Sequence, residues 1–380
     1  MFNLQILEDS STAWAYLRRV VEASHPVVNS LLDTGLPVSE VAMAIAEANP
    51  RLPRELLEAT QARRAVDPRP DMECASRRGW RLITRESPEW PESFGSAFVT
   101  QELNVHSLNS AVRGLRFAPF AVYVAGPGDL STLARHSVTM VGTRAATRYG
   151  SEVATEWSGQ FAAHGLTIIS GGAEGIDACA HHSALSRRSP TVAVMAGSLD
   201  RPYPKKHYEL FRQIVDGGGV LVSEYPPDTA PARHRFLTRN RLAAALGGAT
   251  VVVEAALRSG ALNTLNWANS MNKPTFAVPG PVTTVGSQGC LKAIQEQRAQ
   301  LARSAAEIIE ALQGTQLSLE LSGPSLSWEQ TAIIDATLRP VEVEEIHRDT
   351  GLPMAIVVRQ LRTLSSMGLV RRVGNQWQRV

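Results

Sequence analysis

Short apolar runs alternate with helical patterns through the middle of the chain, from residue 137 to about 312. The runs are rich in Val, Ile and Thr, as expected of strands buried on both faces of a sheet, and lie at 137–141, 166–169, 191–195, 220–223, 250–254 and 274–278. The helical patterns between them include 208–215, 239–246 and 263–270. This alternation predicts an α/β fold with a largely parallel, doubly wound sheet.

The N-terminal region, residues 1–75, predicts helices only. Ser11 or Thr12 can cap the first helix, and Pro53 suits the first turn of the third. A proline-rich break at 67–70 marks the end of this region. Small helical domains of this kind often bind partners or DNA, but a plain packing module is the simpler interpretation.

Two further regions flank the alternating segment. Residues 76–136 predict strands at 80–84 and 120–125, as a lead-in that packs on the main sheet. After a Gly/Ser/Leu linker at 313–326, the tail, 327–380, shows three helical patterns and then two short strands around a Gly-Asn turn. Three helices and a β-ribbon predict a winged helix-turn-helix domain.

The composition fits a soluble globular protein, since 44% of the residues are hydrophobic and 19% are charged. The net charge of +2 implies no global basic field, so any anion site must be local. The three cysteines lie far apart without a CxxC pair, which argues against a disulfide framework or a zinc site. There is no signal-peptide pattern and no run of about 18 apolar residues. We therefore expect a cytoplasmic protein without a membrane span.

The strongest chemical signal follows the first two strands of the sheet. One strand leads into Gly142-Thr-Arg144, and the next leads into a loop of three glycines that include Gly171 and Gly172; each turn precedes a helix. Unpaired N–H groups and the helix dipole favour an anion there, and Arg144 adds a positive charge. The loop lacks both the Walker A pattern and the GxGxxG spacing. It therefore predicts a phosphate site without ATP hydrolysis, and Asp177 can cap the helix that follows.

Lysines and acidic residues near other strand ends carry weaker signals. Lys205 and Lys206 stand at the start of a helix, where the dipole disfavours cations unless an anion is bound; a solvated surface pair is the alternative. The turn at 258–260 is either a third anion site or a plain loop. No nucleophile elbow, metal cluster or close carboxylate pair is evident, so we expect no metal and no cofactor. Glu174 and Glu254 could approach each other, but structural roles are the simpler interpretation.

The densest basic segment, 233–241, contains one aromatic residue among its arginines. Arginine pairs with phosphates through two parallel hydrogen bonds, and an aromatic face can stack a nucleic-acid base. We therefore interpret Arg233, Phe236, Arg239 and Asn240 as a nucleic-acid site ahead of the next helix. The alternative is a solvated basic turn with Phe236 in the core.

The order of these motifs resembles the DNA-processing protein A (DprA or Smf) family. The resemblance covers residues 80 to about 312 in sequence, and the flanking regions in layout. Each motif is weak alone, but their order and spacing are specific. They lie at 141–144, 149–150, 170–177, 200–205, 223–225, 236–241, 253–255, 259–264, 277–280 and 287–290.

The resemblance implies an extended Rossmann-like fold that binds single-stranded DNA without known catalysis. It implies a homodimer that protects incoming strands and loads the RecA recombinase in natural transformation. It assigns DNA binding to Arg144, Lys205, Arg233 and Phe236, with Phe236 stacking a base. It also implies that the N-terminal helices form a SAM-like domain and the tail a winged-helix domain.

A second function stays open at this point, because related Rossmann proteins cleave nucleoside monophosphates at the glycosidic bond. Such enzymes carry a Gly-Gly-x-Gly-Thr loop followed by Glu. The corresponding strand end here reads Arg-Ser-Gly-Ala-Leu-Asn at 258–263, which disfavours the enzyme.

Overall fold

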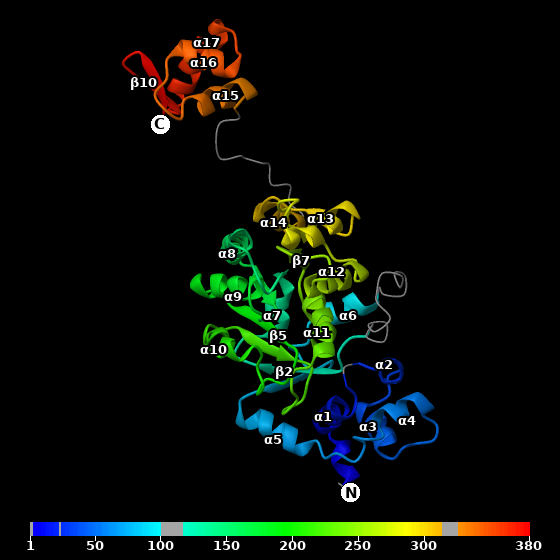
Figure 1. Ribbon diagram of the computed structural model, residues 1–380. Coiled ribbons are helices and arrows are strands. Elements are labelled where there is room, and N and C mark those ends of the chain that lie inside the picture. Colours follow the sequence, from blue (N-terminus) through cyan, green and yellow to red (C-terminus); the bar gives the residue numbers. More distant parts are fainter. Residues whose placement is uncertain (1–2, 23, 100–116, 314–325) are drawn as a thin grey trace. The chain divides into compact units, whose positions relative to one another are not determined.

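The computed structural model describes residues 3–22, 24–99, 117–313 and 326–380. The chain divides into two compact units, Met1–Thr315 and Gln316–Val380, which are described separately (Figure 1). No helix within the described residues is long and apolar enough to cross a membrane.

A large sheet forms the centre of the first unit, with nine strands among the described residues in the order β1-β2-β6-β5-β4-β3-β7-β8-β9. Neighbours from β6 to β9 are parallel, whereas β2 pairs antiparallel with both β1 and β6. The predicted fold class is confirmed, although the strands of the lead-in join the sheet at its edge. The strands are β1 (Arg81–Thr84), β2 (Ala121–Ala125), β3 (Ser137–Val141), β4 (Thr167–Ser170), β5 (Thr191–Met195), β6 (Val220–Ser223), β7 (Ala249–Val252), β8 (Thr275–Ala277) and β9 (Gln300–Leu301).

Helices cover both faces of this sheet, because alternate residues of each buried strand point in opposite directions. In β5, Val192 and Val194 pack toward one layer and Ala193 and Met195 toward the other. The first layer consists of α6 (Glu92–Val99), α7 (Leu130–Arg135), α11 (Arg233–Leu246) and α12 (Gly260–Ser270). The second consists of α5 (Arg69–Arg77), α8 (Arg148–Ala163), α9 (Ile176–Ser186), α10 (Tyr208–Asp216) and α14 (Ala305–Gln313), while α13 (Gln288–Gln295) packs beside α12.

Two helix boundaries in the N-terminal region differ from the prediction. Asp9, not Ser11 or Thr12, caps the first helix, since its carboxylate accepts from the Thr12 N–H at 2.8 Å. Helix α5 begins inside the predicted proline-rich break, because proline is tolerated in a first helical turn, and it continues past residue 75. The helices of this region are η1 (Leu4–Glu8), α1 (Ser10–Val20), α2 (Pro26–Asp33), α3 (Val38–Ala46) and α4 (Arg54–Thr60).

Buried charges tie the N-terminal helices to the sheet. Glu224, directly after β6, accepts two hydrogen bonds from Arg241 of α11, at 2.6 and 2.7 Å, and lies 3.5 Å from Arg18 of α1. All three side chains are at most 1% exposed. Glu22, in the segment that follows α1, accepts from Arg235 Nε at 2.7 Å. Helix α1 and the segment after it are therefore linked to α11 by charged contacts at two levels.

The second unit contains the helices and the hairpin predicted for the tail. Its helices are α15 (Trp328–Ala336), α16 (Val343–Thr350) and α17 (Met354–Ser366), followed by the antiparallel pair β10 (Val370–Val373) and β11 (Gln376–Arg379). Ser327 and Gln330 form a reciprocal capping box at the start of α15. Apolar residues of all three helices and of β10 form its own core.

Candidate functional site

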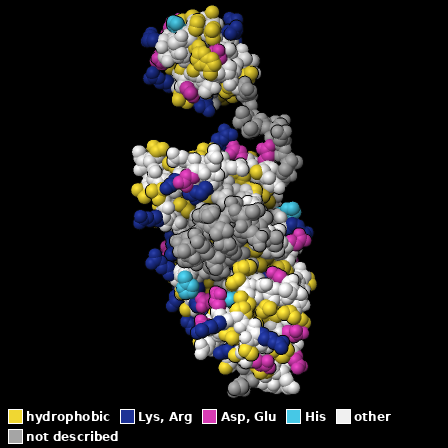
Figure 2. Space-filling model, turned by 90° about the vertical axis from the view of Figure 1, so that its right-hand side faces the viewer, with side chains coloured by type: hydrophobic (Ala, Val, Ile, Leu, Met, Phe, Trp, Pro, Cys, Tyr) yellow, Lys and Arg dark blue, Asp and Glu magenta, His cyan; other side chains and the backbone are white. Residues whose placement is uncertain are grey.

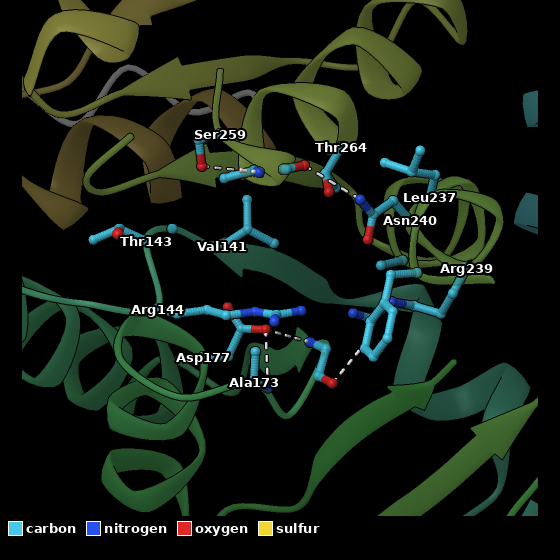
Figure 3. Close-up of a pocket in the computed structure, with 16 residues that line it drawn as sticks. Val141, Thr143, Arg144, Ala173, Asp177, Leu237, Arg239, Asn240, Ser259 and Thr264 are labelled. Atoms are coloured by element: carbon cyan, nitrogen blue, oxygen red, sulfur yellow. Dashed lines mark hydrogen bonds between the residues drawn. The ribbon is translucent and has the colours of Figure 1, made fainter. Parts of the chain in front are cut away.

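The loops after β3, β4 and β7 meet at one edge of the sheet and surround a cavity of about 280 Å³ (Figure 3). Strand β4 lies on one side of β3 and β7 on the other, so the chain changes direction across the sheet at this point. Open α/β sheets bind ligands at such switch points. Helices α11 and α12 close the cavity on its other side.

Helix α11 starts six residues before the predicted 239–246 segment, so the basic segment is helical rather than a turn. No glycine or proline interrupts it, and Pro231 lies just ahead of its start. Helical spacing places Arg233, Phe236, Leu237 and Asn240 on one face. Three of these, Phe236, Leu237 and Asn240, line the cavity.

Arg144 and Phe236 meet at the mouth of the cavity. The guanidinium carbon of Arg144 lies 5.1 Å from the centroid of the Phe236 ring, and Tyr203 approaches the same ring edge-on with a centroid distance of 5.5 Å. Phe236 is half-buried and Arg144 is exposed. The ring therefore has partners other than solvent, which sequence reasoning missed. The stacking of a base on Phe236 stays a prediction.

Arg239 points into the protein rather than toward solvent. It is 6% exposed, and its Nη1 donates to the carbonyl oxygens of Gly171, at 2.7 Å, and Val194. A side chain at position 171 would collide with this guanidinium, which explains the glycine. Arg239 lines the cavity but is committed to the backbone of the glycine loop. Its direct contact is therefore with the loop that shapes the site.

Asp177 supports the same glycine loop from the other side. The prediction that it caps its own helix is wrong, because its Oδ2 reaches back to accept from the N–H groups of Gly171 (3.1 Å) and Ala173 (3.3 Å). Burial raises the pKa of the Asp177 carboxyl, and the positive charge of Arg239 and these N–H groups oppose that shift. The loop is thus fixed before any ligand arrives.

Glu254, after β7, fixes the loop that carries Arg144. Its carboxylate accepts from the N–H of Thr147 at 2.9 Å and from the hydroxyl of Thr147 at 2.6 Å, and its own carbonyl accepts from the Thr143 N–H at 2.8 Å. Glu174 is instead paired with Lys206 at 2.7 Å, and that hydrogen bond lowers the pKa of Glu174. The two glutamates thus bond to different partners, Glu254 to Thr147 and Glu174 to Lys206.

The remaining predicted residues do not line this cavity. Lys205 is exposed at the start of η5 (Lys205–His207), and Gly172 is linked to that turn, since its carbonyl oxygen lies 3.0 Å from His207 Nδ1. Arg233 lines a second, adjoining cavity together with Arg144 and Phe236. The described residues contain no group of three His, Cys, Asp or Glu side chains that could hold a metal ion.

Comparison with known proteins decides the family. Residues 81–313 match the family of DNA recombination-mediator protein A. The chain belongs to this family. It is 37% identical over 382 residues to the DNA processing protein DprA of Mycobacterium tuberculosis. This match covers 98% of this chain and 95% of that protein. It is 34% identical to Protein Smf of Escherichia coli, covering 69% of this chain and 72% of the relative.

Two solved structures of family members are similar to this chain. DNA processing protein A of Streptococcus pneumoniae matches with a TM-score of 0.57 and 26% identity, covering 81% of this chain and 97% of that one. DNA processing protein A of Helicobacter pylori, whose structure concerns its single-stranded DNA binding mode, matches with a TM-score of 0.50 and 27% identity. That match covers 62% of this chain and 96% of the other.

Proposed function

We propose that the chain binds single-stranded DNA at the strand-end site and catalyses no reaction there. The observation that carries this proposal is the pairing of Arg144 with the partly exposed ring of Phe236 at the mouth of a cavity. A guanidinium and an aromatic face together suit a phosphate and its base. The binding mode described for the Helicobacter pylori relative supports the same ligand.

The electrostatics of the site also favour a polyanion. Among the described residues, no carboxylate lies within ion-pair distance of Arg144, Lys205 or Arg233. On the face shown in Figure 2, basic and acidic side chains are interspersed, in keeping with the net charge of +2. Arg144 and Arg233, which line adjoining cavities, and the exposed Lys205 are therefore available for phosphates.

The experiment is a gel shift or anisotropy titration with oligo-dT against a duplex of equal length, at several salt concentrations. We expect tighter binding of the single strand, little sequence preference and a linear fall of log K with log salt. Equal affinity for duplex and single strand would contradict the proposal. The alternative, a nucleotide-cleaving enzyme, predicts release of adenine from AMP, and we expect none.

In the cell, we propose that the protein acts in the cytoplasm as a homodimer that protects incoming strands and loads RecA in natural transformation. The SAM-like and winged-helix regions then serve as accessory domains. Size-exclusion chromatography with light scattering tests the dimer. The rate at which RecA assembles on strands covered by single-strand-binding protein, with and without this chain, tests loading.

A further inference from the structure

A second cavity, of about 1140 Å³, adjoins the first and shares Arg144, Phe236 and Ser259 with it. It extends from Phe236 along α12 to α13, and we refer to it as the α12 groove. Among the residues that line only this groove, the sequence pointed to Arg233 as a DNA contact and to the 258–260 turn, which contains Arg258, as either an anion site or a plain loop. Its size and its continuity with the proposed site raise the question of what it holds.

The α12 groove carries more positive than negative charge. Arg144, Arg233 and Arg258 have no carboxylate within ion-pair distance among the described residues, and Arg258 is exposed. Glu296 is the acidic member of the lining, and it is paired with Arg298 at 2.7 Å and with Lys292 at 3.6 Å. The groove thus retains three unpaired guanidiniums along its length.

Arg258 stands where a cation is otherwise unfavourable. It directly precedes Ser259, which caps the N-terminus of α12 by accepting from the Ala261 N–H at 3.3 Å. The positive end of the helix dipole disfavours a cation at this position, and a bound phosphate would offset both charges. The exposed side chain of Leu257, 55% exposed, adds an apolar surface beside it.

Two amides of α12 complete the groove with unused donors. Asn263 and Asn266 lie three residues apart and therefore on one face of the helix. The Oδ1 of Asn263 accepts from Asn240 at 3.2 Å, and the Oδ1 of Asn266 accepts from Arg298 Nη1 at 2.9 Å. Both oxygens are therefore occupied, and both Nδ2 groups are without an acceptor among the described residues. Such donors suit the carbonyl oxygens and ring nitrogens of unpaired bases.

We propose that the α12 groove binds the nucleotides that adjoin the one at Phe236, with Arg258 on a phosphate and Asn266 donating to a base edge. The strand then turns around Phe236 from the first cavity into the groove. This inference rests on the proposed single-strand binding and adds its direction and extent. It makes affinity depend on oligonucleotide length.

The test measures oligo-dT affinity over lengths from about 4 to 16 nucleotides, the range of site sizes of single-strand-binding OB folds, for the full chain and its variants. We expect Arg258→Ala to bind the shortest oligonucleotides normally and the longest ones roughly two- to fivefold more weakly, as for one exposed ion contact. Its log K versus log salt slope for long oligonucleotides falls by about 0.7. Asn266→Ala likewise weakens only the binding of long oligonucleotides.

Arg303→Ala is the matched control, because Arg303 is an exposed arginine, paired with Glu307, that lines neither cavity. Melting temperatures of all variants verify folding. An equal loss at every length would place Arg258 in the first cavity, and unchanged affinity at every length would remove the groove from the DNA path; either result overturns the inference. If the unaltered chain binds no oligo-dT of any length, the proposed function itself fails.

Discussion

Two sets of arginines in the first unit differ in burial and partners. Arg18, Arg239 and Arg241 are at most 6% exposed and bond to a carboxylate or to backbone carbonyls. Arg144 and Arg233 are exposed and have no carboxylate partner among the described residues. The first set holds helix α11 and the glycine loop in place, and the second set is free to bind a ligand.

The difference follows from the cost of burying charge. A guanidinium removed from water must recover its hydration through hydrogen bonds, so a buried arginine has little capacity left for DNA. An exposed arginine keeps its donors hydrated and exchanges water for phosphate at low cost. Sequence alone cannot separate the two sets, because Arg233, Arg239 and Arg241 lie within nine residues of one another on the same helix.

The largest expected effect is that of Glu224→Gln on folding. Removing the one carboxylate that Arg18 and Arg241 share leaves two buried guanidiniums without their common anionic partner. Breaking such a pair costs about 3–5 kcal/mol of unfolding free energy, measurable by urea denaturation. Glu152→Gln, which breaks an exposed pair with Arg148, is the control and is expected to cost at most about 0.5 kcal/mol.

If Glu224→Gln is too unstable to purify, a second variant keeps the test decisive. Adding Arg241→Met removes one of the orphaned charges and should recover part of the lost stability. A single variant as stable as the parent, or a double variant no better than the single one, would show that the buried cluster does not hold α1 against α11.

Arg239→Met comes next and distinguishes a positioning role from a DNA contact. Losing the bonds to the Gly171 and Val194 carbonyls should cost about 1.5–3 kcal/mol of stability, the range for hydrogen bonds to a charged group. Oligo-dT affinity should fall because the glycine loop loses its support. The log K versus log salt slope should not change, since Arg239 neutralises no phosphate. A flatter slope would return Arg239 to the DNA-contacting set.

Phe236→Ala tests a residue that lies between the two sets, half-buried against Arg144 and Tyr203. If a base stacks on the ring, oligo-dT affinity should fall by roughly 1–3 kcal/mol. Stability should fall by less than the 3–5 kcal/mol typical of a core phenylalanine. Phe236→Trp serves as the companion variant, because a stacked indole is quenched when DNA is added. A variant that melts early yet binds normally while folded would end the stacking hypothesis.

How far the sequence could predict this site depends on which physical signal each residue leaves. Buried parallel strands are continuous apolar runs, so the sheet and the positions of Gly171 and Arg144 at strand ends could be predicted. The start of α11 could not, because Ala232 offers no side-chain cap and the first turn is basic, contrary to the usual signature. Starting the predicted helix only at residue 239 hid the helical faces that separate Arg239 from Phe236.

Contacts between distant segments left even less signal in the sequence. Asp177 supports the glycine loop and Glu254 the Arg144 loop through hydrogen bonds that depend on the folded sheet. Both residues stand beside recognisable turns, but an acid near a turn is also compatible with a cap or a solvated surface. The pairing of Glu224 with arginines from two distant helices has no local pattern at all.

The comparison of buried with exposed basic side chains extends to histidine. His181 is fully buried beside the Thr191 hydroxyl at 2.8 Å, and burial lowers the pKa of His181 from 6.5 to about 3. Below pH 6.5 the unfolded chain binds a proton that the native state does not, so stability is lost as the pH falls from 6.5 toward 3. At pH 5.5, one pH unit below the unfolded pKa of His181, the loss of unfolding free energy is about 1.4 kcal/mol.

His181→Gln should remove that share of the pH dependence, because glutamine does not titrate. The measurement is the difference in unfolding free energy between pH 7.5 and pH 5.5, which should shrink by about 1.4 kcal/mol relative to the parent. His164→Gln, the same substitution at an exposed position, is measured alongside as the control. An equal pH dependence in parent and His181→Gln would mean that His181 is protonated in the native state.

The smallest expected effect, and the most specific, is that of Arg144→Ala on the salt dependence of DNA binding. Each phosphate neutralised on a single strand releases counterions that contribute about 0.7 to the slope of log K against log salt. Arg144→Ala should lower the slope by that amount and leave stability within about 0.5 kcal/mol, as for an exposed residue. Arg148→Ala is the matched control: it lies four residues away, is exposed, and is paired with Glu152. Because the charge of Arg148 is already balanced and its side chain lines neither cavity, the slope for Arg148→Ala should equal that of the parent. If both variants lower the slope equally, the long-range electrostatic field of the surface governs binding, rather than a phosphate contact near Phe236. The distinction between paired and unpaired arginines then fails at the site where it matters most.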